Sequence, residues 1–249
     1  MKAIILAAGV GHRLGKRWGQ RPKILLEFGG RTLLQRHLEA LRRINIHDIT
    51  IAVGHRAGDI EDAIVRLAPG KSVRTRVNPR YRCGSIVSLW SVREVFDSGN
   101  DILLMDGDVL CDDRILGRLM GSAHRDVFLL DRVIEAGEEP VKLCIRGGQI
   151  VDFGKNVERD FDFFGESVGF FRFSAGTCCE IARTVDSYVE RGETEKSYEV
   201  AIRDHVLDAS PDTFVFEDIS GLPWIEIDFP EDMARAQNEI LPKLAEASN

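Results

Sequence analysis

Glycines and basic residues alternate directly after the first apolar run of the sequence, in the order Leu6-Ala7-Ala8-Gly9-Val10-Gly11-His12-Arg13-Leu14, and Arg21-Pro22-Lys23 follows. Glycines let backbone amides approach phosphate oxygens, and Arg and Lys neutralise phosphate charge. Residues 12–23 contain no acid, although the whole chain has a net charge of −7. A basic loop on an acidic protein indicates a small polyanionic ligand and argues against a general nucleic-acid binder.

Two better-known phosphate-binding motifs do not fit this segment. A dinucleotide-binding fingerprint needs a third glycine where Leu14 stands, which disfavours a Rossmann oxidoreductase. A P-loop needs a glycine where Val10 stands and a Ser or Thr where Arg17 stands. A simple glycine turn with solvated charges would explain one Gly-x-Gly, but the basic run ending in Pro22-Lys23 favours phosphate binding.

Two pairs of carboxylates are the next candidates. Asp106-Gly107-Asp108 follows an apolar run, and Glu226-Ile227-Asp228 stands before an expected helix, where strand alternation would put both acids on one face. Mg²⁺ takes oxygen ligands, usually one or two carboxylates together with substrate phosphates. The structural alternatives are an Asp-Gly turn that closes a strand, and capping of the helix by Asp228. Pro230 at the first helical position would make Phe229 the cap, which weakens the second alternative.

Strand and helix patterns alternate in the first half of the chain. We expect strands at 2–8, 48–53, 72–77 and 101–105, with helices at 59–67 and 85–96. Thr32 and Gln35 predict the start of another helix, whose buried side would carry Leu33, Leu34, His37, Leu38 and Leu41. The alternation predicts an α/β fold with a mostly parallel central sheet and flanking helices. Both the basic loop and Asp106-Gly107-Asp108 follow carboxyl ends of strands, so we expect them on the same rim of the sheet.

The second half has a different pattern. We expect strands at 127–131, 141–146, 149–153, 167–173, 213–217 and 224–227, with a hairpin turn at Gly147-Gly148. Helices are expected at 175–190 and 198–209, and a last one from Pro230. No repeat or clear linker interrupts the chain, and 249 residues lie at the upper end of what one hydrophobic core serves. A single domain over residues 1–249 is therefore expected.

Composition narrows the class of protein further. The chain is 44% hydrophobic and 29% charged, which is ordinary for a soluble globular enzyme. Its five cysteines form no Cys-x-x-Cys pair, which argues against a disulfide scaffold or a zinc site. The apolar start is too short for a signal peptide, and no stretch approaches the roughly 18 apolar residues that span a bilayer. We expect a cytoplasmic protein without membrane insertion; the oligomeric state stays open.

The pattern LAAGxGxRL followed by RPKxLLxxxGxxLL resembles the sugar-phosphate and alcohol-phosphate nucleotidyltransferases, which have a glycosyltransferase-A-like, Rossmann-type fold. Within that group the chain is most similar to cytidylyltransferases acting on phosphocholine, aminoethylphosphonate and inositol-1-phosphate. Three further stretches carry the resemblance: 78–81 leading to 85–90, 106–108, and 224–228. Many relatives have Asn-Asn where Gly84-Ser85 stands here.

The resemblance implies a Mg²⁺-dependent transfer of CMP from CTP to a small phosphorylated alcohol or phosphonate, releasing pyrophosphate and a CDP-activated product. Residues 1–110 would bind the NTP, and residues 111–249 would bind the acceptor and complete the metal site. The implied catalytic residues are Arg13, Lys23, Asp106 and Asp228, and the implied metal ligands are Asp106, Asp108, Glu226 and Asp228. The implied nucleotide contacts are Leu6, Ala7, Ala8, Gly9, Gly11, Arg13, Lys23, Ser85 and Asp106.

Acceptor contacts are expected from the second half of the chain, at Lys142, Lys155, Glu166, Tyr198 and Glu199. Phe161, Phe163, Phe164, Tyr198 and Trp224 could form an aromatic cage for a quaternary ammonium, or could belong to the core. A hexose-1-phosphate uridylyl- or thymidylyltransferase is an alternative within the same class. A non-catalytic nucleotide sensor is an alternative of another class, which the presence of Arg13, Lys23, Asp106 and Asp228 disfavours.

Overall fold

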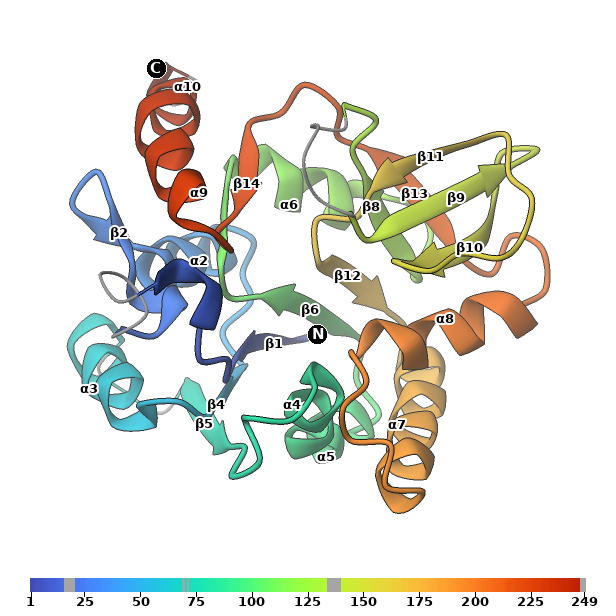
Figure 1. The fold of residues 1–249 in the computed structure, drawn as a ribbon, viewed down its shortest axis with the longest axis horizontal. Helices are drawn as coiled ribbons and strands as arrows, with labels where there is room; N and C mark the ends of the chain where they lie inside the picture. The colour runs from blue at the N-terminus through green and yellow to red at the C-terminus, as the bar shows by residue number, and fades with distance from the viewer. Residues whose placement is uncertain (16–20, 69, 71, 134–139, 247–249) are drawn as a thin grey trace.

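A seven-stranded sheet forms the centre of the molecule (Figure 1). The computed structural model describes residues 1–15, 21–68, 70, 72–133 and 140–246. The strands of the central sheet are β1 (Lys2–Ala7), β4 (Ile49–Val53), β5 (Val73–Val77), β6 (Ile102–Asp106), β8 (Val127–Leu130), β12 (Phe170–Phe173) and β13 (Val215–Asp218). Their order is β13-β8-β12-β6-β1-β4-β5, and β12 runs antiparallel to both of its neighbours. The other neighbouring pairs are parallel, so the expected mostly parallel, mixed sheet is confirmed.

Three small sheets surround the central one. Strands β9 (Lys142–Arg146), β10 (Gln149–Gly154) and β11 (Phe163–Glu166) form an antiparallel sheet at the upper right of Figure 1. The turn between β9 and β10 is the expected Gly147-Gly148 hairpin. Strands β2 (Glu27–Phe28) and β3 (Arg31–Thr32) form a short hairpin. Strand β7 (Val109–Cys111) pairs antiparallel with β14 (Trp224–Glu226), which brings distant parts of the chain together beside residues 106–108.

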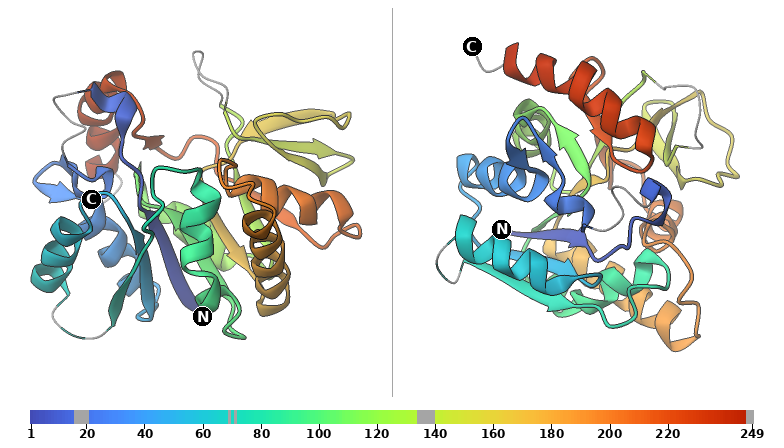
Figure 2. Two further views of the ribbon diagram at one scale, coloured as in Figure 1. Left: turned by 60° about the horizontal axis from the view of Figure 1, so that its bottom comes forward. Right: turned by 60° about the vertical axis from the view of Figure 1, so that its left-hand side comes forward.

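Helices cover both faces of the central sheet, and the left-hand view of Figure 2 shows the strands between them. One face carries α2 (Leu33–Arg43), α3 (Ala57–Leu67), α6 (Asp113–Gly121), α9 (Pro230–Arg235) and the π-helical turn η3 (Ala236–Ile240), which α10 (Leu241–Glu246) continues. The other face carries α4 (Ser85–Ser91), α5 (Arg93–Phe96), α7 (Ala175–Glu190) and α8 (Glu199–Asp208). Two 3₁₀ turns, η1 (His12–Leu14) and η2 (Lys23–Leu25), lie in the segment after β1.

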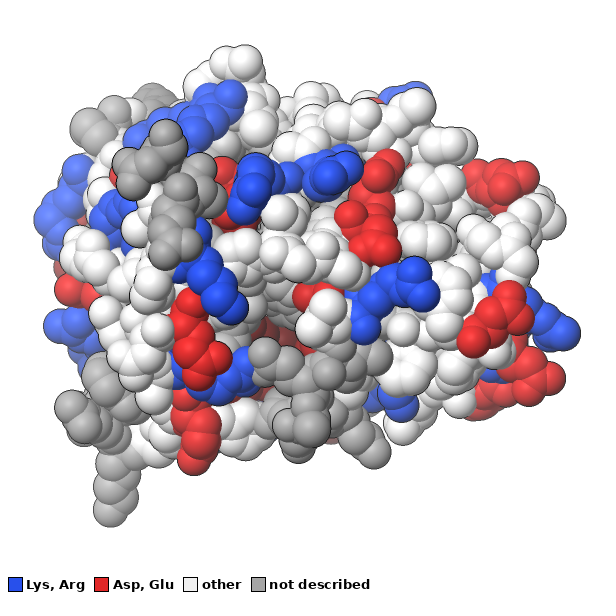
Figure 3. Space-filling view, turned by 90° about the horizontal axis from the view of Figure 1, so that it is seen from above, with Lys and Arg blue, Asp and Glu red and all other residues white. Residues whose placement is uncertain are grey.

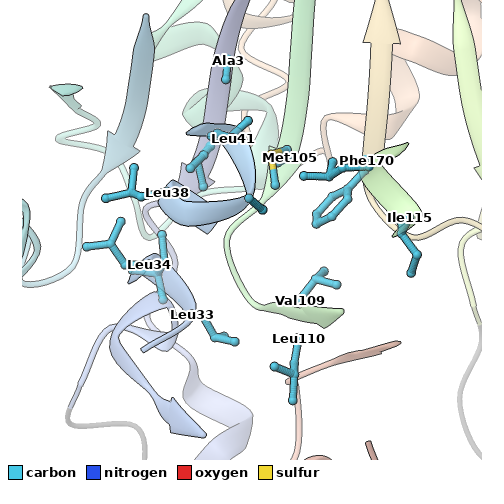
Figure 4. Packing of buried hydrophobic residues seen from close by; sticks show 14 of the residues in the cluster. Ala3, Leu33, Leu34, Leu38, Leu41, Met105, Val109, Leu110, Ile115 and Phe170 are labelled. Atoms are coloured by element: carbon cyan, nitrogen blue, oxygen red, sulfur yellow. The ribbon is translucent and has the colours of Figure 1, made fainter. Parts of the chain in front are cut away.

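Alternation along the buried strands explains the two helical layers. In β1, Ala3 and Ile5 belong to one hydrophobic cluster, while Ile4 and Leu6 belong to the other. Helix α2 contributes Leu33, Leu34, Leu38 and Leu41 to the hydrophobic cluster that also contains Met105 and Phe170 of the sheet (Figure 4). His37 is 2% exposed on the same side of this helix, and the Thr32 hydroxyl accepts a hydrogen bond from the Gln35 amide. The expected helix start and buried face are therefore confirmed.

Some expected elements were wrong in their extent. The helix expected at 85–96 is two helices, because the chain leaves helical geometry at Val92. The strand expected at 167–173 is also wrong, since β11 ends at Glu166 and β12 begins at Phe170, in different sheets. Gly169, with φ of 74°, lets the chain turn between them.

Two elements of the middle of the chain were missed by the sequence reading. Strand β7 follows directly after Asp108, and helix α6 is capped by the Asp112 carboxylate, which accepts from the Arg114 amide. On the face shown in Figure 3, the acidic and basic side chains of the described residues are interspersed. Within the part of the chain that the structure describes, no helix combines the length and apolar character needed to cross a bilayer.

Candidate nucleotidyl-transfer site

The basic loop begins where β1 leaves the centre of the sheet. Gly11 has φ of 67°, and a Cβ there would lie 3.4 Å from Cγ of Lys23, so the loop packs closely on the lysine stem. Leu14 is 1% exposed and Ile24 is 1% exposed, and these two side chains anchor η1 and η2 to the core. Arg13 and Lys23 then line a cavity of about 240 Å³. Its other lining residues include Leu6, Ala7, Gly9, Gly11, Gly107, Asp108 and Asp228.

The loop of Asp106, Gly107 and Asp108 is held by backbone hydrogen bonds on both sides. The Asp106 amide donates to the Gly169 carbonyl at 3.0 Å, and the Gly107 amide donates to the Leu6 carbonyl at 2.9 Å. A Cβ at Gly107 would lie 2.8 Å from that Leu6 oxygen, so only glycine fits there. The backbone that carries the two aspartates is therefore held in a fixed position.

The two aspartates of this loop have different partners. The Asp106 carboxylate accepts a hydrogen bond of 2.7 Å from the Tyr198 hydroxyl. The Asp108 carboxylate instead lies with those of Glu226 and Asp228, where one oxygen from each residue lies within 4.8 Å of the others. Pairing of β7 with β14 and a 3.0 Å bond from the Ile227 amide to the Asp108 carbonyl bring this acidic cluster together. Of the carboxylates expected to bind metal, Asp106 thus stands apart, while Asp108, Glu226 and Asp228 converge.

Two cations of the basic loop reach the acidic cluster. The Lys23 ammonium donates to Asp108 at 2.9 Å and also donates to Asp228. Arg13 donates to the other oxygen of Asp228 at 3.0 Å. Burial disfavours the charged ammonium, but Asp108 and Asp228 outweigh that effect and raise the pKa of Lys23. The two features expected on one rim of the sheet therefore lie in direct contact.

The carboxyl groups of the site differ in their electrostatics. Burial raises the pKa of Asp106 well above its usual value, and the charges of Asp108 and Glu199 add to the effect. Glu226 is open to solvent on one side, yet loss of hydration within the cleft and repulsion by Asp108 and Asp228 raise its pKa. Burial alone would raise the pKa of Asp228, but Lys23 and the more exposed Arg13 lower it. The site thus has more carboxyl groups than cations, and added positive charge would relieve their repulsion.

The acidic cluster fits a divalent cation such as Mg²⁺. The three side chains offer hard oxygen donors, and their spacing of at most 4.8 Å is compatible with ligands of one small ion. Mg²⁺ also retains positions for phosphate oxygens, and the cluster opens onto the cavity that the basic loop lines. Asp108, Glu226 and Asp228 could therefore hold a divalent ion next to the cavity that the basic loop lines.

A second cavity, of about 80 Å³, adjoins the acidic cluster. Lys155, Glu166, Tyr198 and Glu199 line it, and it reaches Asp106, Glu226 and Asp228. These four are expected acceptor contacts. The fifth, Lys142, is not among the residues that line this cavity; its ammonium lies 5.7 Å from the centre of the Phe164 ring.

Of the five aromatic residues considered for a cage, only Tyr198 lines this cavity. Tyr198 lines it together with Phe171, whereas Phe163 and Phe164 lie in β11 and contact Arg132 and Lys142. The indole of Trp224 donates to Asp131 at 2.7 Å. Glu199 gives this cavity a free hydrogen-bond acceptor, because its Oε2 atom is buried without a hydrogen-bond partner among the described residues.

Ser85 connects the two sides of the site. Its hydroxyl accepts a 2.9 Å bond from the Tyr198 amide, and it lines a third cavity, of about 350 Å³, with Leu6, Ala8 and Gly9. A Cβ at Gly84 would lie 2.0 Å from the Lys196 carbonyl oxygen. This close passage of the two segments leaves no room for a side chain at Gly84.

Several residues of these cavities were not assigned by the sequence reading. His12 lines two of the cavities, and Tyr81, Arg82 and Cys83 line the one that contains Ser85. The available signal was the stretch from Asn78 onwards, which carries the resemblance. Asn78 is fully buried and shapes this loop by donating to Ser88 and accepting from the Arg80 amide.

Comparisons with known proteins identify relatives of this chain. The chain is 26% identical, over 97% of its length, to a CMP-5'-(3-aminopropyl)phosphonate synthase of Streptomyces rubellomurinus, and it covers 39% of that protein. It is 28% identical, over 96% of its length, to a bifunctional IPC transferase and DIPP synthase of Rubrobacter xylanophilus, covering 52% of it. The chain therefore spans about half or less of these two curated relatives.

A solved structure confirms the fold. The inositol-1-phosphate CTP transferase from T. maritima superposes with a TM-score of 0.75 at 18% identity, covering 100% of this chain and 96% of that one. The sequence profile of the MobA-like NTP transferase domain matches residues 3–147, which include the basic loop, Lys23 and Asp106-Gly107-Asp108. The expected class of nucleotidyltransferases is thus confirmed, and the chain belongs to the MobA-like NTP transferase family.

Proposed function

We propose that this protein is a Mg²⁺-dependent cytidylyltransferase that transfers CMP from CTP to a small phosphorylated alcohol or phosphonate. The observation that carries the proposal is the direct contact between the basic loop and the acidic cluster, through Lys23, Asp108 and Asp228. The basic loop and the acidic cluster line one cavity, and the smaller cavity on the acceptor side also reaches Asp228. The choice of CTP is supported by the relatives, whose names specify CMP and CTP products or substrates.

In the proposed reaction an acceptor oxygen attacks the α-phosphorus of CTP in line. The new P–O bond forms as the bond to the β-phosphate breaks, and pyrophosphate leaves. The attacking oxygen is already anionic, so no general base is required, and catalysis consists of positioning and charge neutralisation. The backbone of residues 6–9 would frame the nucleotide, and Arg13 and Lys23 would neutralise phosphate charge. Mg²⁺ on the acidic cluster would supply further charge neutralisation between the phosphates.

The acceptor side supports a zwitterionic substrate. Lys155 is the basic residue among those lining the small cavity, whereas Glu166, Glu199 and Glu226 are acidic. A phosphate or phosphonate group would lie towards Lys155 and the metal, and an ammonium group would lie against Oε2 of Glu199. An aminoalkyl phosphonate has this arrangement of charges, as does the product named for the Streptomyces relative. The polyol part of inositol-1-phosphate carries no positive charge and would therefore not neutralise the Glu199 carboxylate.

The test is pyrophosphate release in Mg²⁺ with CTP, UTP, ATP, GTP or dTTP against a panel of acceptors. The panel contains 2-aminoethylphosphonate, phosphoethanolamine, phosphocholine, inositol-1-phosphate, glycerol phosphate and glucose-1-phosphate. Release with CTP and an amine-bearing acceptor is the expected result. Release only with UTP or dTTP and glucose-1-phosphate would instead establish the sugar-phosphate alternative. NTP binding without release from any pair would favour a nucleotide sensor.

A variant of Glu199 tests the acceptor class separately. Glu199→Gln keeps the shape of the side chain and removes its charge, so kcat/KM for an aminoalkyl acceptor should fall about tenfold or more, while that for glycerol phosphate changes little. Glu158→Gln is a suitable control, because Glu158 is an exposed carboxylate that does not line this cavity. Equal losses for both acceptors would argue that Glu199 supports the fold and does not recognise an amine.

A further inference from the structure

The Lys23 ammonium already binds two of the three carboxylates of the acidic cluster. It donates to Asp108 at 2.9 Å and to Asp228, and its side chain is 16% exposed. The lysine stem is held against Gly11, so the ammonium cannot be regarded as a freely rotating surface charge. An internal cation therefore lies where the cluster would otherwise collect an external one.

A divalent ion and the Lys23 ammonium require the same oxygen atoms. The cluster that fits a metal consists of Asp108, Glu226 and Asp228, and two of these three accept hydrogen bonds from Lys23. A second positive charge placed among them would also be repelled by the ammonium at close range. Full metal binding therefore requires Lys23 to give up its contacts with Asp108 and Asp228.

The same cavity offers Lys23 an alternative set of partners. Lys23 lines it together with Gly9, Gly11 and Arg13, the residues proposed to bind the triphosphate. Phosphate oxygens arriving in this space would accept hydrogen bonds from the ammonium and compensate for the loss of the carboxylates. The nucleotide would thus provide the hydrogen-bond acceptors that replace Asp108 and Asp228 as partners of Lys23.

We propose that the Lys23 ammonium occupies the cation site of the acidic cluster in the free protein and moves to the phosphates when a nucleotide binds. Binding of the nucleotide and binding of the metal would then strengthen each other. The inference rests on the proposed function, in that both ligands must use this cleft. Because coupling between two ligands is reciprocal, the metal must also strengthen nucleotide binding by the same factor. In the free protein the metal should bind weakly, even though a fitting set of carboxylates is already assembled.

Direct Mn²⁺ binding tests this, with Mn²⁺ standing in for Mg²⁺ and water proton relaxation as the readout. The wild-type protein is titrated alone and with a non-hydrolysable α,β-methylene analogue of CTP, and protein-free mixtures are subtracted. We expect Mn²⁺ to bind the wild type at least about tenfold more tightly when the analogue is present. Lys23→Met keeps the length of the side chain without its charge, and should bind Mn²⁺ alone at least about tenfold more tightly than wild type does.

Two further variants identify where the ion binds and why. Lys155→Met removes a positive charge that acts on Asp228 without contacting it, and should tighten Mn²⁺ binding much less than Lys23→Met does. Adding Asp108→Asn to Lys23→Met should abolish the gained affinity if the ion enters the acidic cluster. The wild-type titrations need no variant, so they test the proposal even if Lys23→Met folds poorly.

The outcomes separate this inference from the proposed function. Equal Mn²⁺ affinity of the wild type with and without the analogue would overturn the inference while leaving the cytidylyltransferase proposal intact. Unchanged Mn²⁺ affinity in a folded Lys23→Met variant would overturn it as well. If Mn²⁺ does not bind the wild type even with the analogue, while the enzyme turns over in the panel assay, the metal site itself is misplaced and the inference falls with it.

Discussion

Acidification should destabilise this protein through His37, whose ring is almost entirely buried beside the backbone of Gly107. Burial lowers the pKa of His37 from its ordinary 6.5 to about 4, while the ring still bonds to the backbone of Gly107. Between these two values the unfolded chain takes up a proton that the folded chain does not. Stability therefore falls as the pH falls through 6.5 towards about 4, and is fully retained above 6.5.

The size of the effect follows from the two pKa values. The difference between 6.5 and about 4 corresponds to about 3.4 kcal/mol over the whole range. Between pH 7 and pH 5 the loss should be about 1.8 kcal/mol, because part of the range lies below pH 5. With a urea slope of about 2–3 kcal/mol per molar, the midpoint of unfolding should fall by about 0.6–0.9 M.

The assay compares urea unfolding of the wild type and of His37→Leu at pH 7 and pH 5. The variant loses the bond to Gly107 at both pH values, so only the change between pH 7 and pH 5 is compared. That change should be about 1.8 kcal/mol smaller in His37→Leu than in the wild type. The control is His47→Gln, which removes a histidine from the surface of the protein. An identical pH dependence in wild type and His37→Leu would refute the reasoning.

Three other substitutions have defined expectations. Arg203→Met removes two side-chain hydrogen bonds, of 2.7 and 3.2 Å, from the fully buried Asp152. It should lower the free energy of unfolding by about 3 kcal/mol in urea titrations. A loss below about 1 kcal/mol would show that the backbone amides alone stabilise the Asp152 carboxylate. Gly84→Ala should collide with the Lys196 carbonyl and raise the KM of the acceptor in steady-state assays; an unchanged KM would disconnect this contact from the site. Lys23→Met should lower kcat at least about 100-fold and change nucleotide affinity far less, as measured by turnover and by equilibrium titration; an unchanged kcat would remove it from the reaction.

Local patterns with a single physical cause predicted the first half of the fold well. The Thr32 cap and the leucines of α2 follow from helix geometry alone, and both were confirmed. The rim position of Lys23 and Asp108 follows from the parallel sheet, and the two side chains indeed meet. The roles assigned to these residues in binding and catalysis remain predictions.

The errors lie where tertiary contacts override a local pattern. Residues 167–173 are apolar enough for one strand, but Gly169 packs against the Asp106 side chain and turns the chain there. The partner of Asp106 is Tyr198, which is 92 residues away in the sequence and has no local signal that points to it. Residue types and spacing also do not specify that Asp106 lies outside the group of Asp108, Glu226 and Asp228, and its role as a metal ligand stays a prediction.

The pairing of β7 with β14 has a consequence for the order in which the chain becomes functional during synthesis. Strand β6 gains β1 as a neighbour once residue 106 has formed, but its other neighbour, β12, needs residues up to 173. Glu226 and Asp228 reach Asp108 only when the segment after residue 223 has been made. A nascent chain that folds from its N-terminus would therefore present the basic loop well before it acquires the acidic cluster. Ribosome-bound chains halted between residues 180 and 220 would have the Lys23 ammonium without Asp228 as its partner.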